Sequence, residues 1–162
     1  MDFNIRKAVS NDMIHVYGMI KELAEFENMP NGPQIDEKKL IEDGFESENP
    51  IFKCFVAECT DSKIVVGYAI YFPIYSTWEG RALFLEDLYV KPEYRKHHIG
   101  LKLIKAVAKQ ALSENCKRLD LHVLSWNPAM KFYEKLNAVN LTKSEDWNFV
   151  RFGTDAIAKL AE

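Results

Sequence analysis

Residues 84–101 hold the densest group of chemically useful side chains, in the order Phe-Leu-Glu-Asp-Leu-Tyr-Val-Lys-Pro-Glu-Tyr-Arg-Lys-His-His-Ile-Gly-Leu. Cationic or imidazole side chains gather where a helix is expected to begin: Arg95, Lys96, His97, His98 and Lys102. The first amides of a helix have no partner within it, and its dipole is positive at that end, so phosphate groups bind there. An ordinary solvated loop is the competing interpretation.

Two adjacent acids, Glu86 and Asp87, interrupt a strand-like apolar run just before this loop. A carboxylate can accept the proton of an alkylammonium, whose pKa of about 10.4 keeps it protonated and non-nucleophilic at neutral pH. An acid inside a hydrophobic strand needs a partner or a purpose, because burying its charge is costly. We therefore take Glu86 as the candidate base, with a solvated acidic pair at the strand end as the alternative.

The pattern Val90-x-Pro92-x-Tyr94-Arg95-x-x-x-Ile99-Gly100 resembles the acetyl-CoA pyrophosphate loop of the GNAT acetyltransferase superfamily. Further blocks resemble the spermidine/spermine (diamine) and thialysine N-acetyltransferase family, in order and over nearly the whole chain: 20–27, 40–45, 85–90, 126–127 and 131–133. The resemblance implies an α+β fold with a GNAT-type mixed, mostly antiparallel central sheet flanked by helices. It also implies a strand–loop–helix acetyl-CoA site.

The resemblance implies roles for individual residues. Those implied to bind acetyl-CoA, largely through backbone amides, are Leu88, Tyr89, Val90, Arg95, Lys96, His97, His98, Ile99, Gly100, Leu101, Asn127 and Ala129. Tyr133 would lie beside the thioester sulfur, where its hydroxyl can protonate the departing thiolate. Without the resemblance, Tyr133 beside Phe132 on an amphipathic helix would be interpreted as a core residue.

An acidic lining is implied around the amine substrate. The residues concerned are Phe26, Glu27, Glu86, Asp120, Leu121, His122 and Glu145. Such a lining suits a polyamine or a lysine-like amine, although Glu27 alone is equally typical of a solvated helix end. Trp126 and Trp147 offer cation–π faces, or else belong to the core or a dimer contact. Direct attack by the amine needs no reactive cysteine, and we expect no metal.

The loop departs from the family pattern at two positions. Family members usually carry Arg-Gly-x-Gly-x-Gly, whereas Lys96 and His98 stand at the first two glycine positions here. Glycine allows close approach to phosphate and unusual dihedral angles. We expect the loop to keep its shape with right-handed dihedral angles, and its added positive charge to offset the missing glycines. Asn137 also replaces a glycine, at a helix end where asparagine tolerates the left-handed conformation.

Apolar periodicity and turn residues predict one domain over residues 1–162. Helices are expected over 10–28 with Ser10 as N-cap, then over 36–44, 99–115, 127–136 and at the C-terminus. Strands are expected over 3–8, 52–59, 64–75, 81–90, 118–124, 139–142 and 147–152. Hairpin spacing makes residues 52–90 an antiparallel meander, and residues 82–124 form a βαβ unit.

Composition excludes several classes of protein. The chain has 162 residues, 48% of them hydrophobic and 28% charged, which argues against disorder. A net charge of −3 leaves no basic excess for a general nucleic-acid binder. No secretory segment is recognisable, and the longest uncharged run, residues 64–78, is too short to span a membrane. Three cysteines suit a reducing compartment, so we expect a cytoplasmic protein without nucleic-acid or membrane partners.

The leading hypothesis is an acetyl-CoA-dependent N-acetyltransferase acting on a small cationic amine, either thialysine or a diamine or polyamine. One alternative is a GNAT enzyme acting on protein lysine or N-terminal amines. Another is a non-catalytic sensor of acyl-CoA or polyamine, which the altered loop motivates. The resemblance further implies a homodimer, with the C-terminal strands and helix contributing to its interface.

Overall fold

The computed structural model describes residues 2–162, which divide into two compact units. The first unit reaches to His122 and contains the sheet, and the second runs from Val123 to Glu162 and contains three short helices. A single domain over residues 1–162 remains a prediction. In the described chain, no helix combines the length and the apolar character that crossing a membrane requires.

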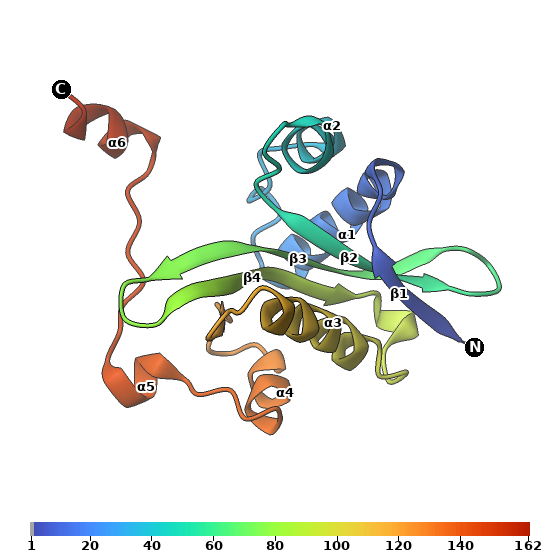
Figure 1. The fold of residues 1–162 in the computed structure, drawn as a ribbon. Helices are drawn as coiled ribbons and strands as arrows, with labels where there is room; N and C mark the ends of the chain where they lie inside the picture. The colour runs from blue at the N-terminus through green and yellow to red at the C-terminus, as the bar shows by residue number, and fades with distance from the viewer. Residues whose placement is uncertain (1) are drawn as a thin grey trace. The chain divides into compact units, whose positions relative to one another are not determined.

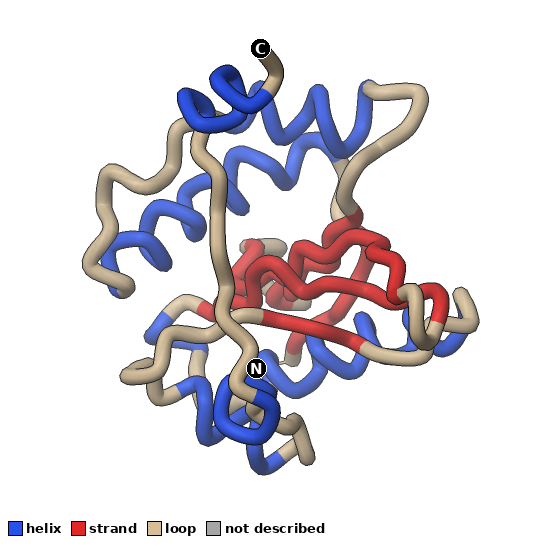
Figure 2. Tube along the Cα trace, turned by 90° about the vertical axis from the view of Figure 1, so that its left-hand side faces the viewer, coloured by secondary structure: helices blue, strands red, loops and turns tan. Residues whose placement is uncertain are grey.

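One five-stranded sheet forms the centre of the first unit, with the strands in the order β1-β2-β3-β4-β5. The strands are β1 (Phe3–Lys7), β2 (Lys53–Cys59), β3 (Val65–Ser76), β4 (Gly80–Val90) and β5 (Leu119–Leu121). The first four pair antiparallel, and β5 pairs parallel with β4. This confirms the meander and the βαβ unit, and Figure 2 shows the strands as one red layer.

Helices cover both faces of this sheet. They are α1 (Met13–Phe26), which follows a 3-10 turn at Ser10–Asp12, α2 (Glu37–Ile41), which continues as a π turn, and α3 (Ile99–Ser113). Alternate strand residues face opposite sides, so two hydrophobic cores form. One packs α1 and α2 on the sheet, and the other packs α3 on the opposite face (Figure 1). The predicted α+β class and its helix-flanked mixed sheet are confirmed.

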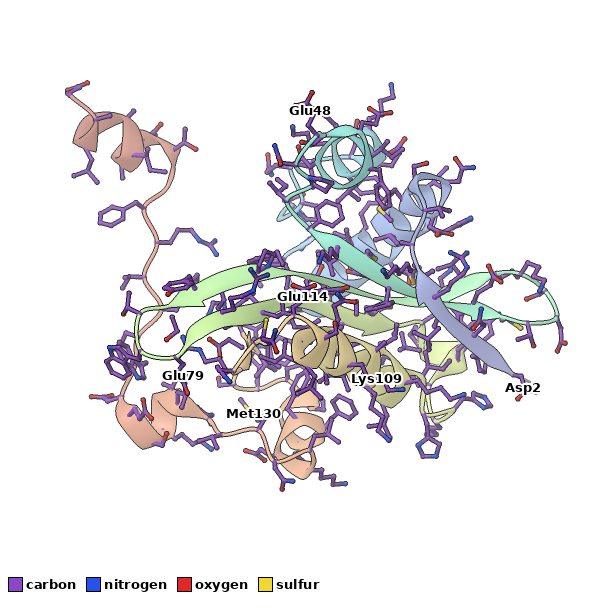
Figure 3. All side chains as sticks on the ribbon, viewed as in Figure 1. Asp2, Glu48, Glu79, Lys109, Glu114 and Met130 are labelled. Carbon is purple, nitrogen blue, oxygen red and sulfur yellow. The ribbon has the colours of Figure 1, made fainter. Side chains whose placement is uncertain are left out.

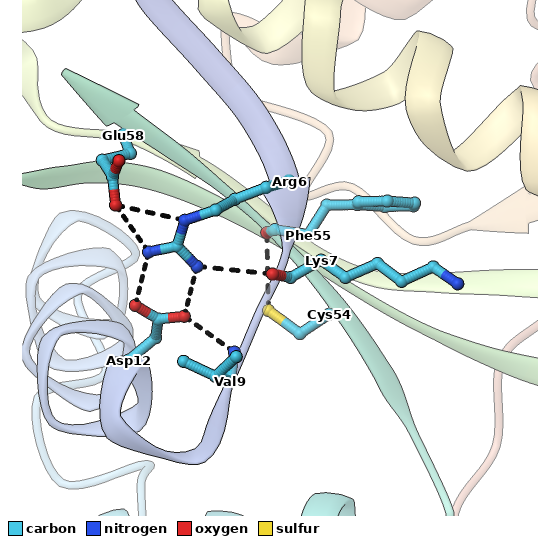
Figure 4. Close-up of polar contacts among 7 residues, drawn as sticks. All are labelled: Arg6, Lys7, Val9, Asp12, Cys54, Phe55 and Glu58. Carbon is cyan, nitrogen blue, oxygen red and sulfur yellow. Dashed lines mark hydrogen bonds and ion pairs between the residues drawn. The ribbon is translucent and has the colours of Figure 1, made fainter. Parts of the chain in front are cut away.

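Two ion networks tie helices to the sheet. Glu114, which follows α3, accepts a hydrogen bond from Lys53 Nζ at 2.6 Å and lies 3.5 Å from Arg81 Nη2 (Figure 3). Before α1, the N-cap of the first helical turn is Val9 rather than the predicted Ser10, and the Asp12 side chain accepts the backbone amide of Val9 at 2.8 Å. Arg6 of β1 holds the same carboxylate (Figure 4). The ion pair of Arg6 with Asp12 thus fixes a helix start one residue before the predicted one.

A β-bulge interrupts the pairing of β3 with β4. Ile70 lies opposite Asp87 and Tyr71 lies opposite Leu85, so Glu86 is the extra residue of β4. Beyond this point β4 also leaves β5, because their parallel ladder ends at Leu85 opposite Leu121. Residues 86–90 therefore pair only with β3, and their other backbone edge has no strand partner.

The second unit corrects part of the strand prediction. Its helices are α4 (Ala129–Lys135), α5 (Leu141–Glu145) and α6 (Thr154–Leu160). The strand predicted over 139–142 is wrong, because the Asn140 side chain accepts the amide of Lys143 and starts a helix there. Residues 147–152 form no strand, since an alternating apolar pattern makes a strand only where a neighbouring strand completes the ladder. Asn137 does adopt the expected left-handed conformation, with φ of 67°.

Candidate active site

Asp87 is the most perturbed carboxylate of the first unit. Tyr68, fully buried in β3, donates its hydroxyl to Asp87 Oδ2 at 2.9 Å. Burial raises the pKa of Asp87 to about 6, the charges of Glu86 and Glu27 add to this rise, and the Tyr68 hydrogen bond opposes it. A carboxyl group with this pKa is ionised at neutral pH and is a stronger base than one in water.

Two further acids complete the electrostatic surroundings of Asp87. Glu86 is the exposed residue of the bulge, and Glu27 follows α1 in a half-buried position where burial raises its pKa. Both charges act on Asp87. Within residues 2–162 none of these three carboxylates forms an ion pair, so the negative charge where α1 ends and β4 bulges suits a cation.

The open edge of β4 offers backbone groups beside these acids. The amide of Lys91 donates to Val66 O of β3 at 2.9 Å, so odd-numbered residues at this end of β4 direct their backbone groups toward β3. The backbone groups of Leu88 and Val90 point to the other edge of β4, away from β3. The resemblance implies that the amides of Leu88, Tyr89 and Val90 bind acetyl-CoA. Of these three, only the amides of Leu88 and Val90 lie on the open side of β4.

The loop between β4 and α3 corrects the expectation of right-handed dihedral angles. Lys96 has φ of 70° and His98 has φ of 58°, both in the left-handed region. Left-handed His98 followed by the helical Ile99 forms a concave turn in which successive amides converge, a known shape for anion binding. The two residues that replace glycine therefore keep the backbone conformation that glycine favours. The prediction failed because the fold imposes this turn in spite of its steric cost.

The amides of Ile99, Gly100 and Leu101 begin α3, whose first helical hydrogen bond runs from Lys102 N to His98 O at 2.9 Å. Three donors thus face out of the helix end. Nearby, the His97 ring lies 5.5 Å from that of Phe3, which attaches the loop to β1. An anion of the size of a pyrophosphate matches this donor set.

The other predicted substrate residues of the first unit fall into two groups. Phe26 ends α1 beside Glu27, and His122 packs edge-on against the Phe84 ring with centroids 4.8 Å apart. Asp120 instead lies 3.1 Å from Arg118 Nε, as an ion pair without hydrogen-bond geometry. Leu121 packs against the core on the α3 face. Asp120 is thus partly neutralised, and the substrate-binding roles of these residues remain predictions.

The remaining predicted residues belong to the second unit. Asn127 Oδ1 accepts the amide of Ala129 at 2.9 Å, just before α4, whose N-cap is Pro128. Tyr133 is buried on α4 with its ring against Phe132, at a centroid distance of 5.2 Å. Glu145 accepts a hydrogen bond from Trp147 Nε1 at 2.7 Å. The roles assigned to these residues remain predictions.

Sequence reasoning passed over Asp87 and missed Tyr68. The two adjacent acids inside a hydrophobic strand were the available signal, but this signal did not distinguish Asp87 from Glu86. The bulge, which leaves Glu86 exposed while Asp87 is half-buried against Tyr68, depends on pairing with β3. No local pattern in β4 indicates it.

An open strand edge that leads into an anion-binding turn is the arrangement expected of an enzyme that takes an acyl group from CoA. The Acetyltransferase (GNAT) family model matches residues 18–138, and the chain belongs to this acetyltransferase family. It is 46% identical over 164 residues to thialysine N-epsilon-acetyltransferase of Mus musculus, covering 97% of this chain and 96% of that enzyme.

Solved structures agree on the fold. An integron cassette protein from the mobile metagenome of V.cholerae matches with a TM-score of 0.76 and 25% identity, over 100% of this chain and 99% of that one. AAC(6')-Iy in complex with a bisubstrate analog, CoA-S-monomethyl-acetylneamine, matches with a TM-score of 0.71 and 17% identity, over 95% and 99%.

Proposed function

We propose that this acetyltransferase moves the acetyl group of acetyl-CoA to the primary amine of thialysine or a closely related small cationic amine. The observation that carries the proposal is the group of three acids, Glu27, Glu86 and Asp87, beside the open edge of β4. An ammonium group bound there supplies the positive charge that would balance these three acids. The similarity to thialysine N-epsilon-acetyltransferases supports this choice of substrate.

The donor set of the first unit fits acetyl-CoA, which supplies an activated thioester. The backbone groups of Leu88 and the amide of Val90 suit an extended amide-bearing arm laid along β4, while the Val90 carbonyl accepts a hydrogen bond from Arg95 Nε. The convergent amides at the start of α3 suit its pyrophosphate. Among the described residues no cluster of three or more potential metal ligands occurs.

Proton transfer starts the reaction. The carboxylate of Asp87 takes a proton from the substrate ammonium, directly or through water, and leaves a free amine. The amine nitrogen forms a bond to the acetyl carbon, the carbon–sulfur bond breaks, and the nitrogen releases its second proton to water. Asp87 returns its own proton to solvent once the product has left. The CoA thiolate that departs takes the proton of the Tyr133 hydroxyl, a role assigned to Tyr133 by the family resemblance, and the phenolate regains a proton from water. A backbone amide at the open edge of β4 polarises the carbonyl oxygen.

The test follows release of the CoA thiol from acetyl-CoA with thialysine, lysine, putrescine, spermidine, spermine and a lysine peptide. We expect fastest turnover with thialysine and the slowest with the peptide. Preference for the peptide would contradict the proposed substrate class. Turnover of none of these amines by a protein that binds CoA would contradict catalysis and favour a sensor.

We further propose that the active form is a homodimer in which the segment 147–152 and helix α6 contact a second copy of this chain. Trp147, Phe149, Val150 and Phe152 are all more than half exposed, as are Ile157 and Leu160. Alternating apolar residues that lack a strand partner in their own chain match the needs of an identical chain. Sedimentation at micromolar concentration should give a dimer, and Phe149→Ser with Phe152→Ser should give a monomer. A monomeric wild-type protein would contradict this proposal.

A further inference from the structure

Glu22 joins the second half of α1 to the end of β4. Its Oε2 accepts the hydroxyl of Tyr89 at 2.9 Å, and its Oε1 lies 4.0 Å from Nζ of Lys91, the residue that follows β4. One carboxylate of a helix therefore holds two side chains at the point where the strand gives way to the loop.

The Tyr89 side chain is a rigid intermediate in this link. It is buried in the core between α1 and the sheet, with its ring centre 6.4 Å from that of Tyr68. Burial and the hydrogen bond to Glu22 raise the pKa of Tyr89 to about 12, so the hydroxyl stays protonated and keeps donating at neutral pH. A hydrogen bond to an ionised carboxylate is also stronger than one between neutral groups.

The link continues from Tyr89 to the open edge of β4. The guanidinium carbon of Arg95 lies 5.5 Å from the centre of the Tyr89 ring, and Arg95 Nε donates to Val90 O at 2.9 Å. The Arg95 side chain is exposed, so the ring and the carbonyl orient a group that water would otherwise leave free to move. We call Tyr89, Val90, Lys91 and Arg95 the β4 corner.

The β4 corner adjoins the groups proposed to receive the amide-bearing arm of acetyl-CoA. Tyr89 lies between Leu88 and Val90, so a change in its orientation moves the backbone groups on both of its sides. Displacements of about 1 Å are enough to weaken a positioned contact severely. Within residues 2–162, no hydrogen bond or ion pair joins Glu22 to Asp87 or to the open edge itself. Glu22 can therefore act on the cofactor only through the β4 corner.

We propose that Glu22 is a positioning residue for acetyl-CoA, which holds the Tyr89 hydroxyl and so keeps the β4 corner in the geometry that receives the cofactor. The inference rests on the proposed use of acetyl-CoA. Because Glu22 contacts neither the proposed base nor the proposed amine site, its removal should weaken cofactor binding and leave the chemical step and the amine nearly unaffected.

The experiment compares the wild type with Glu22→Ala and Tyr89→Phe. Phenylalanine keeps the ring that lies against Arg95 and removes only the hydroxyl. We expect each variant to raise KM for acetyl-CoA, and the dissociation constant of CoA measured by calorimetry, about three- to tenfold. Both kcat and KM for the fastest amine substrate should stay within twofold. A fall in kcat with an equal rise of both KM values would mark a general loss of structure and overturn the positioning role.

Two further variants test whether the hydrogen bond itself carries the effect. The double variant Glu22→Ala with Tyr89→Phe should bind CoA no more weakly than the weaker single variant, since both changes remove the same bond. Losses that multiply would show two independent effects and overturn the proposal. Glu22→Gln keeps an oxygen that can accept the hydroxyl, so it should restore most of the affinity. A loss in Glu22→Gln as large as in Glu22→Ala would contradict the role of the hydrogen bond.

Glu25→Ala is the matched control. Glu25 is an exposed glutamate on the same helix, and its replacement removes the same charge and makes the same change to helix composition. The affinity for CoA should stay within twofold of the wild type. An equal loss in Glu25→Ala would reduce the effect to the charge or stability of α1 and overturn the proposal. Melting temperatures measured without ligand establish that each variant is folded.

Two outcomes separate this inference from the proposed function. Unchanged affinity for CoA in Glu22→Ala and Tyr89→Phe, with turnover retained, would overturn the positioning role alone. Absence of CoA binding by the folded wild-type protein would overturn the proposed function itself.

Discussion

Asp12 and Asp87 are two carboxylates withdrawn from water in the same unit, and their surroundings shift their pKa in opposite directions. Burial would raise the pKa of Asp12, but Arg6 donates to its two oxygens at 2.7 and 2.9 Å, and with the Val9 amide it lowers the pKa below the usual value (Figure 4). Asp87 has one neutral donor, Tyr68, and its pKa rises to about 6.

The difference separates a structural acid from a reactive one. Asp12 is paired within the fold with the cation of Arg6. Arg6 also pairs with Glu58, whose Oε2 lies 2.7 Å from Arg6 Nη2. Asp87 faces two further acids, so its missing cation has to come from outside the chain. Arg6 therefore makes Asp12 part of the fold's stability, whereas the unbalanced charge at Asp87 is available to a proton or a substrate ammonium.

The largest expected effect comes from Asp87→Asn. The amide cannot accept the substrate proton, so kcat/KM should fall by about 10²- to 10⁴-fold, the usual contribution of a general base. The amide oxygen still accepts the Tyr68 hydrogen bond, so the fold is retained. The thiol-release assay at pH 8 measures the change, and a loss below threefold would remove Asp87 from proton transfer.

The same variant should be more stable than the wild type above pH 6. A folded-state pKa raised to about 6 means that ionised Asp87 opposes folding, and this cost is present above that pH and disappears toward the unfolded value near 4. Asp87→Asn should therefore gain up to about 3 kcal/mol at pH 7 and less at pH 5. Denaturant unfolding at both pH values tests this. A loss of stability at pH 7 would contradict the comparison with Asp12.

Asp12→Asn should have the opposite consequence. It leaves Arg6 with only Glu58 as a charged partner, and unfolding should become easier by about 2 to 4 kcal/mol at pH 7. Because the pKa of Asp12 is lowered in the fold, its contribution is present above pH 4 and lost in acid. The variant should lose less stability than the wild type on acidification. Its kcat/KM, measured below the melting temperature, should stay within twofold.

The contrast also shows what the sequence can and cannot predict. Local patterns placed the helices other than α5, the meander and the loop at the start of α3, because apolar spacing and turn residues act over short distances. The network of Arg6, Asp12 and Glu58 joins residues up to 52 positions apart, and no spacing rule indicates it. The burial of Asp87 and the left-handed angles of Lys96 and His98 likewise depend on neighbouring strands.

Substitutions of Glu86 and Glu27 should have intermediate effects, and the Glu86 variant tests the base predicted from the sequence. Each is partly or fully exposed and acts on the substrate through its charge. Glu86→Gln and Glu27→Gln should raise KM for a diamine about three- to tenfold with a small change in kcat. A fall in kcat for Glu86→Gln as large as that for Asp87→Asn would return the role of base to Glu86.

Tyr68→Phe should have the smallest effect, visible mainly in the pH profile. For the wild type, kcat/KM should fall below about pH 6 as Asp87 takes up a proton. The Tyr68 hydroxyl stabilises the ionised carboxylate, so its removal raises the pKa of Asp87 and moves this acidic limb to higher pH. Activity at pH 8, where both proteins are ionised at Asp87, should differ by less than threefold. A purely structural role for Tyr68 would lower activity equally at every pH and leave the midpoint unchanged. A shifted midpoint with retained activity would instead show that the neutral Tyr68 hydroxyl lowers the pKa of Asp87, as the charged Arg6 lowers the pKa of Asp12.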